Sequence, residues 1–580
     1  MKEKIQALLQ AVLPQLLDAV PEHIQVERTK QKAHGDFATN VALVCGKKAG
    51  MAPRAFAEQL MALIDAPEWL VKMEIAGPGF INFFVAEQTQ LAVVEQVLAS
   101  GAQFGCGAEK STKIHLEYVS ANPTGPLHVG HGRGAAYGSA LANLLTVAGY
   151  PIHREYYVND AGRQMDILAV SVWLRYLECH GAQLAFPSNG YKGEYIKEIA
   201  SQLAARDSDL LVHDPDAVFA GVPQDETKAG QGDKEAHVDG LIVNAKNLLG
   251  EHYATLHGFA LLSVLEDIQA DLAEFHVNFD EWFSEKSLVD EASVQAALDK
   301  LQAGGWLYQK AGATWFKSTE FGDDKDRVLV RENGQTTYFA SDAAYMINKI
   351  QRGYDELVYV LGADHHGYVP RLRALMQAFG YAPERLKVPL VQFAVLYRSS
   401  KQVQMSTRSG SFVTLRELRE EVGTDAARFF YVMRKCEQHL DFDLDLAKSQ
   451  SNDNPVYYLQ YAHARICSVF RQLAEKGWTF DQAAGLAYLS QLDDTQLPDI
   501  ATALATFPEL IQSAASKHES HLLAYYLKDL AQRLHAYYNA HPFLVDDAAI
   551  RNARLCVIAA IQHVLRNGLN ILGVSAPEHM

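Results

Sequence analysis

The chain has 580 residues, of which 48% are apolar, and its formal net charge is −17. This length exceeds what one hydrophobic core supports and predicts about three to five domains. No apolar run approaches the roughly 20 residues that a membrane-spanning helix needs, and the acidic charge excludes a non-specific nucleic-acid binder, which needs a positive field to displace counterions. A local basic surface on an acidic body stays compatible with RNA binding.

The first 20 residues have an amphipathic pattern and lack the apolar core and cleavage site of a signal peptide. We therefore expect a cytoplasmic protein. Six cysteines are scattered along the chain without a C-x-x-C pair, which favours neither a disulfide framework nor a structural zinc site. We expect all six thiols to be buried: Cys45, Cys106, Cys179, Cys436, Cys467 and Cys556.

The first 110 residues have the mixed pattern of a small α+β domain. Apolar residues at helical spacing predict helices over residues 5–17 and 56–63, and Ile75 and residues 80–84 have the pattern of strands. Residues 105–112 then carry the glycines and lysine of a phosphate-binding loop, but the glycine-to-lysine spacing differs and a strand, not a helix, follows. We interpret this stretch as a linker.

The next strand-to-helix turn carries the densest motif of the chain. Residues 114–119 alternate apolar and polar side chains like a half-buried strand, and residues 134–148 have helical apolar spacing. Between them, the glycines and prolines of Ser-Ala-Asn-Pro-Thr-Gly-Pro-Leu-His-Val-Gly-His-Gly-Arg, residues 120–133, break both patterns. The start of a helix offers free N–H groups and a positive dipole end to an anion. We therefore predict that His128 and His131 donate hydrogen bonds to a phosphate and stabilise charge during a displacement.

Two other interpretations of these histidines stay open, namely an incidental pair in a glycine-rich connection and metal ligation. No third His, Cys or carboxylate stands nearby at ligand spacing, which counts against a metal. The surrounding residues favour the phosphate interpretation, because His-Val-Gly-His after Pro-Thr-Gly-Pro-Leu resembles the first signature of class I aminoacyl-tRNA synthetases. Asn-Asp-Ala-Gly-Arg-Gln at residues 159–164 narrows the resemblance to arginyl-tRNA synthetases.

The resemblance covers essentially the whole chain in one order and implies a mixed α/β architecture. It implies an N-terminal α+β domain that contacts tRNA, a Rossmann-like catalytic domain with a parallel sheet, and a C-terminal all-α domain that binds the anticodon. A long stretch inside the catalytic domain, in which we find no evident chemistry, is interpreted as an insertion. The expected segments are an N-terminal domain at 1–110, a catalytic domain at 111–400 with its insertion at about 185–310, a signature loop with connecting helices at 401–450, and an anticodon-binding domain at 451–580.

The resemblance also implies a binding site for L-arginine. A carboxylate suits a guanidinium, because the planar fork donates two parallel, charge-assisted hydrogen bonds. Tyr338 and Asp342 are four residues apart and would share one face of a helix, although by themselves they also fit a routine helix start. The residues at the family's arginine-binding positions are Glu117, Ser120, Asn122, His131, Tyr338, Asp342 and His365.

The implied ATP site combines both class I signatures with a third loop. Residues 356–361 are a short apolar run typical of a buried parallel strand, and Gly-Ala-Asp-His-His-Gly follows at its carboxyl end, where open α/β sheets bind ligands. Asp364 is suited to accept hydrogen bonds from ribose hydroxyls, while the two adjacent histidines also fit simple loop residues. The residues at the implied ATP-binding positions are Pro123, Gly125, His128, Gly130, His131, Gly362, Asp364, His366, Met405 and Ser406.

The second class I signature is matched only in part, by Gln-Met-Ser-Thr-Arg-Ser-Gly. Gln404 and Thr407 stand where the family signature usually has lysines, of which the second neutralises the departing pyrophosphate. Some arginyl enzymes carry a compensating lysine before the first signature, but Gly125 occupies that position here. Arg408 is therefore our candidate for a third catalytic residue, with Lys401 as the second choice. Arg408 also fits a structural ion pair.

Beyond residue 410 the apolar spacing is helical almost throughout, which predicts a bundle. The resemblance implies that side chains of this bundle and of the N-terminal domain contact tRNA, because unstacked bases lie on aromatic rings and bond to exposed amides. Phe80 and the tyrosines also fit core positions. The residues at the implied tRNA-binding positions are Phe80, Asn82, Tyr458, Tyr461, Tyr538 and Met580.

The implied reaction has two steps. The arginine carboxylate attacks the α-phosphorus of Mg-ATP in line, and a ribose hydroxyl of tRNA(Arg) then takes the arginyl group; no protein nucleophile is needed, so positioning and electrostatic stabilisation dominate. The expected partners are ATP with Mg²⁺, L-arginine and tRNA(Arg), with no protein-bound metal, no structural zinc, no membrane and a monomeric chain. The alternatives are another class I synthetase, such as the cysteinyl type with its zinc ligands, a small-molecule adenylating ligase, and a non-catalytic tRNA-binding paralogue.

Overall fold

The computed structural model describes residues 1–29, 31–227, 230–288, 291–403 and 413–580. These residues form two compact units. The first comprises Met1–Phe104, Ile466–Phe507 and Gln532–Val564, and the second comprises Gly105–Arg465, Pro508–Ala531 and Leu565–Met580. The helices that contribute to both units are α17 (Pro455–Glu475), α19 (Leu497–Lys517), α20 (His521–Ala540) and α21 (Ala548–Leu572).

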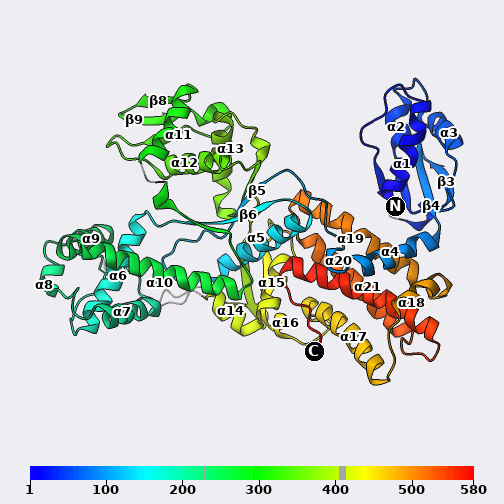
Figure 1. Cartoon of the computed structure of the whole chain (residues 1–580). Coiled ribbons are helices and arrows are strands. Elements are labelled where there is room, and N and C mark those ends of the chain that lie inside the picture. Colours follow the sequence, from blue (N-terminus) through cyan, green and yellow to red (C-terminus); the bar gives the residue numbers. More distant parts are fainter. Residues whose placement is uncertain (30, 228–229, 289–290, 404–412) are drawn as a thin grey trace. The chain divides into compact units, whose positions relative to one another are not determined.

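A four-stranded antiparallel sheet with the order β1-β2-β4-β3 forms the N-terminal part of the first unit (Figure 1). Its apolar face and three helices share one core, to which Ile5, Phe56 and Phe83 contribute fully buried side chains. The predicted α+β module is confirmed, because periods of 3.6 and 2 residues place the apolar side chains of each element on one face. Its elements are α1 (Lys2–Val12), β1 (Val26–Arg28), β2 (Phe37–Thr39), α2 (Val41–Gly46), α3 (Pro53–Leu63), β3 (Leu70–Ala76) and β4 (Phe80–Val85).

Helices make up the rest of the first unit, including α4 (Glu87–Ser100) and α18 (Gln482–Tyr488). Gly485 lets α18 approach α21 closely, because a Cβ at this position would lie 2.4 Å from the carbonyl oxygen of Asn552. Among the described residues, α21 is the helix that is long and apolar enough to cross a membrane. However, 78% of its apolar window is buried inside the structure, as in a core helix.

A five-stranded parallel sheet is the centre of the second unit, in the order β13-β11-β5-β6-β7. The strand order reverses between β5 and β11, and the carboxyl ends of strands at such a switch point are where open α/β sheets bind ligands. The predicted α/β fold with a Rossmann-like parallel sheet is confirmed, and its edge strand β7 lies within the stretch expected to be an insertion. The strands are β5 (Ile114–Glu117), β6 (Ile152–Val158), β7 (Glu281–Ser284), β11 (Glu356–Tyr359) and β13 (Leu386–Lys387).

Helix α5 (Val129–Val147) follows β5 and contacts it closely at Gly138. A Cβ at Gly138 would lie 2.4 Å from ring carbons of the fully buried Tyr118. We expect Gly138→Ala to lower the free energy of unfolding by about 1–3 kcal/mol, because overpacking displaces the ring. A lower midpoint of thermal unfolding would show this. Gly134→Ala is the matched control on the same helix, since its added Cβ would have no neighbour within 4 Å; an equal loss in both variants would contradict the packing argument.

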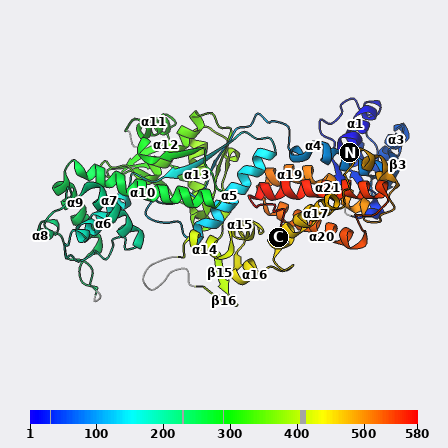
Figure 2. The same cartoon turned by 60° about the horizontal axis from the view of Figure 1, so that its bottom comes forward.

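A group of helices follows β6, and all of them except α6 lie within the stretch expected to be an insertion. Figures 1 and 2 show α6, α7, α9 and α10 side by side. The buried indole of Trp173 on α6 donates a hydrogen bond of 2.8 Å to the carbonyl oxygen of Leu211, which holds the connection after α7 onto this group. The helices are α6 (Arg163–Cys179), α7 (Glu194–Asp207), α8 (Pro215–Val218), α9 (Lys234–Leu249) and α10 (His252–Glu274).

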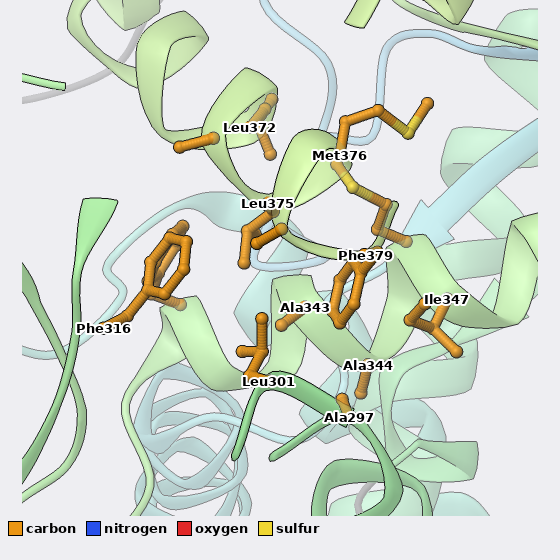
Figure 3. Close-up of a cluster of buried hydrophobic side chains, with 14 of the residues drawn as sticks. Ala297, Leu301, Phe316, Ala343, Ala344, Ile347, Leu372, Leu375, Met376 and Phe379 are labelled. Carbon is orange, nitrogen blue, oxygen red and sulfur yellow. The ribbon is translucent and has the colours of Figure 1, made fainter. Parts of the chain in front are cut away.

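A separate apolar cluster covers the part of the sheet that carries β11 (Figure 3). Leu301, Phe316 and Phe379 meet there around the small residues Ala343 and Ala344 of α12, which let neighbouring helices approach closely. This cluster fixes α12, whose first residues are arginine-site candidates. The contributing elements are α11 (Glu291–Ala303), β8 (Leu307–Lys310), β9 (Ala313–Phe316), β10 (Arg327–Val330), α12 (Tyr338–Gln351) and α13 (Val369–Ala378).

Arg133 at the end of the first signature is a structural anchor. Its fully buried guanidinium donates hydrogen bonds of 2.6–2.9 Å to the backbone carbonyls of Gln392, Lys435 and Gln438. These contacts tie the start of α5 to the segments before β15 and β17. The remaining elements are β12 (Leu361–Gly362), β14 (Leu390–Val391), β15 (Ala394–Arg398), β16 (Lys401–Gln402), α14 (Leu415–Val422), α15 (Thr424–Val432), β17 (Leu440–Asp443) and α16 (Leu444–Lys448).

All six cysteines are free thiols. The prediction that all six are buried is wrong for two of them, because Cys106 and Cys179 are exposed. Cys106 lies in the linker before β5, and Cys179 is the last residue of α6, so neither position faces a core. The buried thiols are Cys45, Cys436, Cys467 and Cys556.

Candidate active site

The two signature histidines cap the first turn of α5. The Nδ1 of His128 accepts a hydrogen bond of 3.1 Å from the N–H of Gly130, and the Nδ1 of His131 accepts one of 3.3 Å from the N–H of His128. Their rings stack with centroids 3.7 Å apart. Because both Nδ1 atoms accept, the proton of each neutral imidazole is on Nε2, so each side chain carries one N–H donor beside the helix start.

Both imidazoles stay neutral at physiological pH. Burial lowers the pKa of His128, and burial together with the adjacent His128 lowers the pKa of His131 to about 3. A neutral donor pair at a helix N-terminus adds to the partial positive charge of the helix dipole without a formal charge. The arrangement therefore suits a phosphate group whose negative charge grows during a reaction.

The glycines of the first signature make room for protein side chains. A Cβ at Gly130 would lie 2.8 Å from the His128 ring, and a Cβ at Gly125 would lie 2.8 Å from the Tyr195 hydroxyl. That hydroxyl donates a 2.6 Å hydrogen bond to the carbonyl oxygen of Thr124. Pro123 is buried beside them. The glycines are thus needed to shape the turn itself, in addition to any ligand that approaches it.

The first signature pairs with the segment after the second one. The N–H of Val129 donates to the carbonyl oxygen of Val413 at 3.0 Å, and the N–H of Leu415 donates to that of Leu127 at 2.8 Å. The first signature is therefore linked by backbone hydrogen bonds to the start of α14 and the residues just before it. Lys401 is exposed at β16. The predicted positions that lie outside the described residues are Gln404, Met405, Ser406, Thr407 and Arg408.

The loop after β11 presents three exposed side chains, Asp364, His365 and His366, at the switch point of the sheet. His366 contacts the carbonyl oxygen of Ala363 through Nδ1 at 3.3 Å. A Cβ at Gly362 would lie 2.5 Å from an oxygen of Asp364, so this glycine lets the carboxylate fold back over the strand end. The loop offers acceptors and ring nitrogens to a ligand above β11.

Glu117 ends β5 and is already paired within the protein. Its Oε1 accepts a 3.1 Å hydrogen bond from the Ser120 hydroxyl, and its Oε2 accepts from the ammonium of Lys349, which is fully buried. Val119 and Ser120 adopt left-handed backbone with φ of 68° and 42°. Such a conformation costs a β-branched residue about 1–3 kcal/mol, and here it turns the Ser120 side chain back toward Glu117. The Ser120 hydroxyl also accepts from the N–H of Tyr157 at 3.1 Å.

Asp342 and Glu285 add two carboxyl groups beside Glu117. The Tyr368 hydroxyl donates a hydrogen bond to Asp342. Burial, with the charges of Glu117 and Glu285 also contributing, raises the pKa of Asp342 to about 7. Burial likewise raises the pKa of Glu285. Glu285 is only 5% exposed, and its Oε2 finds no hydrogen-bond partner among the described residues. In this acidic pocket, defined by Glu117, Asp342 and Glu285, Glu117 is the one carboxylate that forms an ion pair among the described residues.

Asn122 and Tyr338 lie beside the segment Asn159–Gln164. The exposed Asn122 accepts a hydrogen bond from Asn159 at 3.1 Å and donates one to Gln164 at 3.0 Å. The Tyr338 hydroxyl lies 3.9 Å from where a Cβ at Gly162 would stand, and Tyr338 is 67% exposed. Asn122, Tyr338 and the acidic pocket therefore lie around the carboxyl ends of β5 and β6.

Sequence analysis missed Glu285 and Lys349. Glu285 lies in the stretch in which no chemistry was evident, but it directly follows a short aromatic strand, and that position at a strand's carboxyl end is a usable signal. Lys349 has no such signal, because a lysine on a helix ordinarily indicates a solvated face. Its burial depends on Glu117, 232 residues earlier in the chain.

One group of side chains has the spacing of a metal site, among the residues the structure describes: His153, Glu155 and Glu281. Arg352 fills this position, since its guanidinium nitrogens lie 2.6 Å from both Glu155 and Glu281. A guanidinium supplies the positive charge that a metal would bring, so we interpret the group as a structural ion-pair network.

The predicted tRNA-contacting residues differ in exposure. Phe80 is 41% exposed at the start of β4, whereas Asn82 is only 5% exposed, contrary to the expected exposed amide, because it is paired between β2 and β3. Tyr461 is 37% exposed and stacks on Tyr457 with centroids 6.2 Å apart. Met580 is 55% exposed and lines a cavity of about 550 Å³ together with Tyr457.

The other two tyrosines are less open. Tyr458 is partly buried in the second unit. Tyr538 is partly buried in the first unit, where its ring lies 5.2 Å from that of Phe543. Each tyrosine therefore has only part of its surface accessible for a further contact.

Three family profiles match the chain in the expected order. They are "Arginyl tRNA synthetase N terminal domain" over residues 2–85, "tRNA synthetases class I (R), catalytic domain" over residues 93–183 and 254–440, and "DALR anticodon binding domain" over residues 459–580. The gap in the catalytic match corresponds to the helices α7, α8 and α9.

Similar proteins cover the full chain. The arginine–tRNA ligases of Thioalkalivibrio sulfidiphilus and Hydrogenovibrio crunogenus are each 55% identical, with 100% of both chains covered. The solved arginyl-tRNA synthetase of Thermus thermophilus has the same fold, with a TM-score of 0.74, 22% identity and 100% coverage of both chains. On the identity to full-length relatives and the ordered domain matches, the chain belongs to the arginyl-tRNA synthetase family.

Proposed function

We propose that the chain is a ligase that attaches L-arginine to tRNA(Arg) with ATP, through an arginyl-adenylate, releasing pyrophosphate and AMP. The proposal rests on an acidic pocket at the carboxyl edge of the sheet, in which Glu117 is the one carboxylate with an ion-pair partner among the described residues. The central strand of the same sheet leads into the capped pair of neutral imidazoles. Arginine supplies a guanidinium and an ammonium for the pocket and a carboxylate for the reaction. The 55% identity to arginine–tRNA ligases supports this substrate over the cysteinyl type, a small-molecule ligase or a non-catalytic paralogue.

In the first step the arginine carboxylate attacks the α-phosphorus of ATP, and pyrophosphate leaves with the electrons of the broken P–O bond. His128 and His131 donate their Nε2–H groups to phosphate oxygens whose charge grows in the transition state. The N-terminus of α5 adds its dipole. No side chain needs to form a covalent bond, so the protein contributes position and electrostatic stabilisation.

We assign ATP binding to the two signatures and to the loop after β11, as the family resemblance implies. The exposed Asp364 is suited to accept from ribose hydroxyls, and His366 and Gly362 stand beside it. Pro123, Gly125 and Gly130 shape the turn that holds the phosphates. Met405, Ser406 and the charge-compensating Arg408 belong to the proposal on sequence grounds alone. Mg²⁺ enters as part of the ATP substrate.

Arginine recognition is proposed to use the acidic pocket and its rim. Asp342 and Glu285 have the acceptor capacity for a planar guanidinium, which pairs with carboxylates through parallel charge-assisted bonds. Glu117, Ser120 and Asn122 lie toward the turn that leads to the histidines, where they suit the α-ammonium group. The predicted roles of Tyr338, His131 and His365 at the rim belong to the same proposal.

Arginine affinity should rise with pH between about 6 and 8. Asp342 binds a cation when it is ionised, but its pKa is raised to about 7 in the folded protein. Below that pH binding must first release a proton, so we expect the dissociation constant for arginine to be about tenfold higher at pH 6 than at pH 8. Titration calorimetry at a series of pH values checks this. Asp342→Asn should bind arginine weakly and without the pH slope; an unchanged slope in that variant would assign the titration to another group.

For tRNA, the proposal rests on exposed aromatic side chains in both units. Phe80 offers a ring to an unstacked base, and the stacked pair Tyr457 and Tyr461 offers a platform. The cavity beside Met580 has room for a base. Tyr458 and Tyr538, which are partly buried, keep their predicted roles in this proposal. Asn82 requires a contact by its backbone or a movement of β4. A monomeric chain in the cytoplasm, where tRNA and ATP are available, completes the proposal.

ATP–pyrophosphate exchange tests the proposed function. The purified chain is given each amino acid in turn, with and without tRNA. It should exchange labelled pyrophosphate into ATP only when the amino acid is arginine. Charging of tRNA(Arg) with labelled arginine then tests the second step. Exchange with another amino acid, or failure to charge tRNA in the presence of exchange, would overturn the assignment.

A further inference from the structure

The segment Asn159–Gln164 borders the acidic pocket although the proposed reaction assigns it no role. It follows β6 at the carboxyl edge of the sheet, next to the strand end that carries Glu117. Its first and last residues both bond to the Asn122 side chain: Asn159 donates a hydrogen bond to it, and Gln164 accepts one from it. These two bonds determine which end of the Asn122 amide presents oxygen and which presents nitrogen.

Asp160, in the same segment, forms hydrogen bonds with the end of β7 and with the turn that follows it. This carboxylate is only 7% exposed. One of its oxygens accepts a 2.5 Å hydrogen bond from the Ser284 hydroxyl, and the other accepts a 3.0 Å bond from the backbone N–H of Lys286. Ser284 and Lys286 are the neighbours of Glu285 on either side. Asp160 therefore fixes the backbone immediately before and after the pocket carboxylate.

Glu285 depends on such support, because it begins a 3₁₀ turn of three residues, Glu285–Ser287, at an edge strand of the sheet. Its carboxyl group is buried with an oxygen that finds no partner among the described residues. Asp160 also brings a like charge near Glu285, which contributes to the raised pKa of that carboxyl after the larger effect of burial. Burying a carboxylate that is incompletely paired and lies beside another anion costs free energy, and an incoming cation lowers that cost.

We propose that Asp160 is a positioning residue for arginine specificity: its two hydrogen bonds around Glu285 aim that carboxylate at the guanidinium of the substrate. The inference rests on the proposed arginine activation. Asp160 itself touches no substrate in this scheme. Its removal should therefore act on arginine binding and leave the chemistry at the phosphates intact.

The test compares five single variants and one double variant by the KM for arginine, the KM for ATP and kcat in exchange with saturating tRNA. Asp160→Ala should raise the KM for arginine about tenfold to a hundredfold, as expected when a binding group is displaced by about 1 Å, with kcat and the KM for ATP nearly unchanged. Ser284→Ala, which keeps the bond to Lys286, should show a smaller rise. Glu285→Gln should raise the KM for arginine at least as much as Asp160→Ala.

Two controls separate positioning from general stability. Asp160→Asn keeps an acceptor for the Lys286 N–H and an amide that can donate to Ser284, so it should restore a KM for arginine close to that of the unsubstituted chain. Asp280 directly precedes β7, at the end opposite to Ser284, and accepts a 2.7 Å hydrogen bond from the backbone N–H of Arg154. Asp280→Ala should leave the KM for arginine unchanged, even if it lowers the thermal midpoint.

The double variant Asp160→Ala/Glu285→Gln decides the matter. If Asp160 acts through Glu285, the double variant is no worse for arginine than Glu285→Gln alone. Effects that multiply, a loss confined to kcat, or a normal KM for arginine in Asp160→Ala would each overturn the inference. Absence of arginine-dependent exchange in the unsubstituted chain would instead overturn the proposed function, so the two failures are distinct.

Discussion

In ATP–pyrophosphate exchange, His128→Asn should be about a hundredfold to a thousandfold slower than the unsubstituted chain, at nearly unchanged stability. The asparagine side chain places an oxygen where the Nδ1 of His128 accepts the Gly130 N–H, and asparagine is a favoured residue at a helix N-cap. It has no atom at the position of Nε2. The variant thus removes the proposed phosphate donor and keeps the cap.

Two further substitutions at His128 serve as controls. His128→Gln carries an amide nitrogen near the position of Nε2 and should retain more activity than His128→Asn. His128→Ala loses both functions and should also be less stable by about 1 kcal/mol, the usual value of an N-cap. Rapid-quench measurement of adenylate formation and thermal unfolding provide the two readouts. A normal rate in His128→Asn would show that the Nε2 donor does not contribute to the transition state.

Lys349→Met should produce the largest loss of stability of the substitutions considered, about 3–5 kcal/mol. The Lys349 ammonium is fully buried, and it lies 3.7 Å and 3.9 Å from the ring centroids of Tyr345 and Tyr359 while it pairs with Glu117. The Glu117 side chain is itself only 14% exposed. Methionine fills a similar volume but leaves a buried carboxylate without its cation, which is the costly way to break such a pair.

Denaturant unfolding followed by near-UV circular dichroism measures this loss. Glu117→Gln in the same chain should recover much of the stability, because it removes the uncompensated charge, but should not restore arginine activation. Lys197→Met is the matched control, since Lys197 pairs with Glu194 on an exposed helix face and such pairs contribute about 0–1 kcal/mol. Equal losses in Lys349→Met and Lys197→Met would contradict the buried-pair argument.

Much of the fold followed from local patterns. The strand before the first signature, the helix after it and the elements of the N-terminal module were predictable because apolar spacing is a property of short stretches. The same holds for the first turn of α12, where Tyr338 and Asp342 begin one helix face. The cysteines show the limit of such patterns. Their spacing along the sequence does not tell which thiols are exposed, and Cys106 and Cys179 are exposed.

The pocket was less predictable. Glu285 was overlooked because its significance depends on β7 joining the sheet beside β6, and that pairing joins residues more than a hundred positions apart. Asn82 was expected to be open, but the strands on both sides of β4 bury it. In each case the deciding contact comes from a distant element, which a local pattern does not contain.

The amino-acid sequence alone determined the family, the parallel-sheet architecture and the positions of both signatures, since motifs and hydrophobic periods are encoded residue by residue. Only the tertiary structure decided which atoms of those motifs are available. In the folded chain the Nδ1 atoms of both histidines accept hydrogen bonds, Glu117 pairs with Lys349, and an oxygen of Glu285 has no partner among the described residues. The physical reason is that hydrogen-bond capacity and charge balance are settled by neighbours in space, and sheet order selects those neighbours.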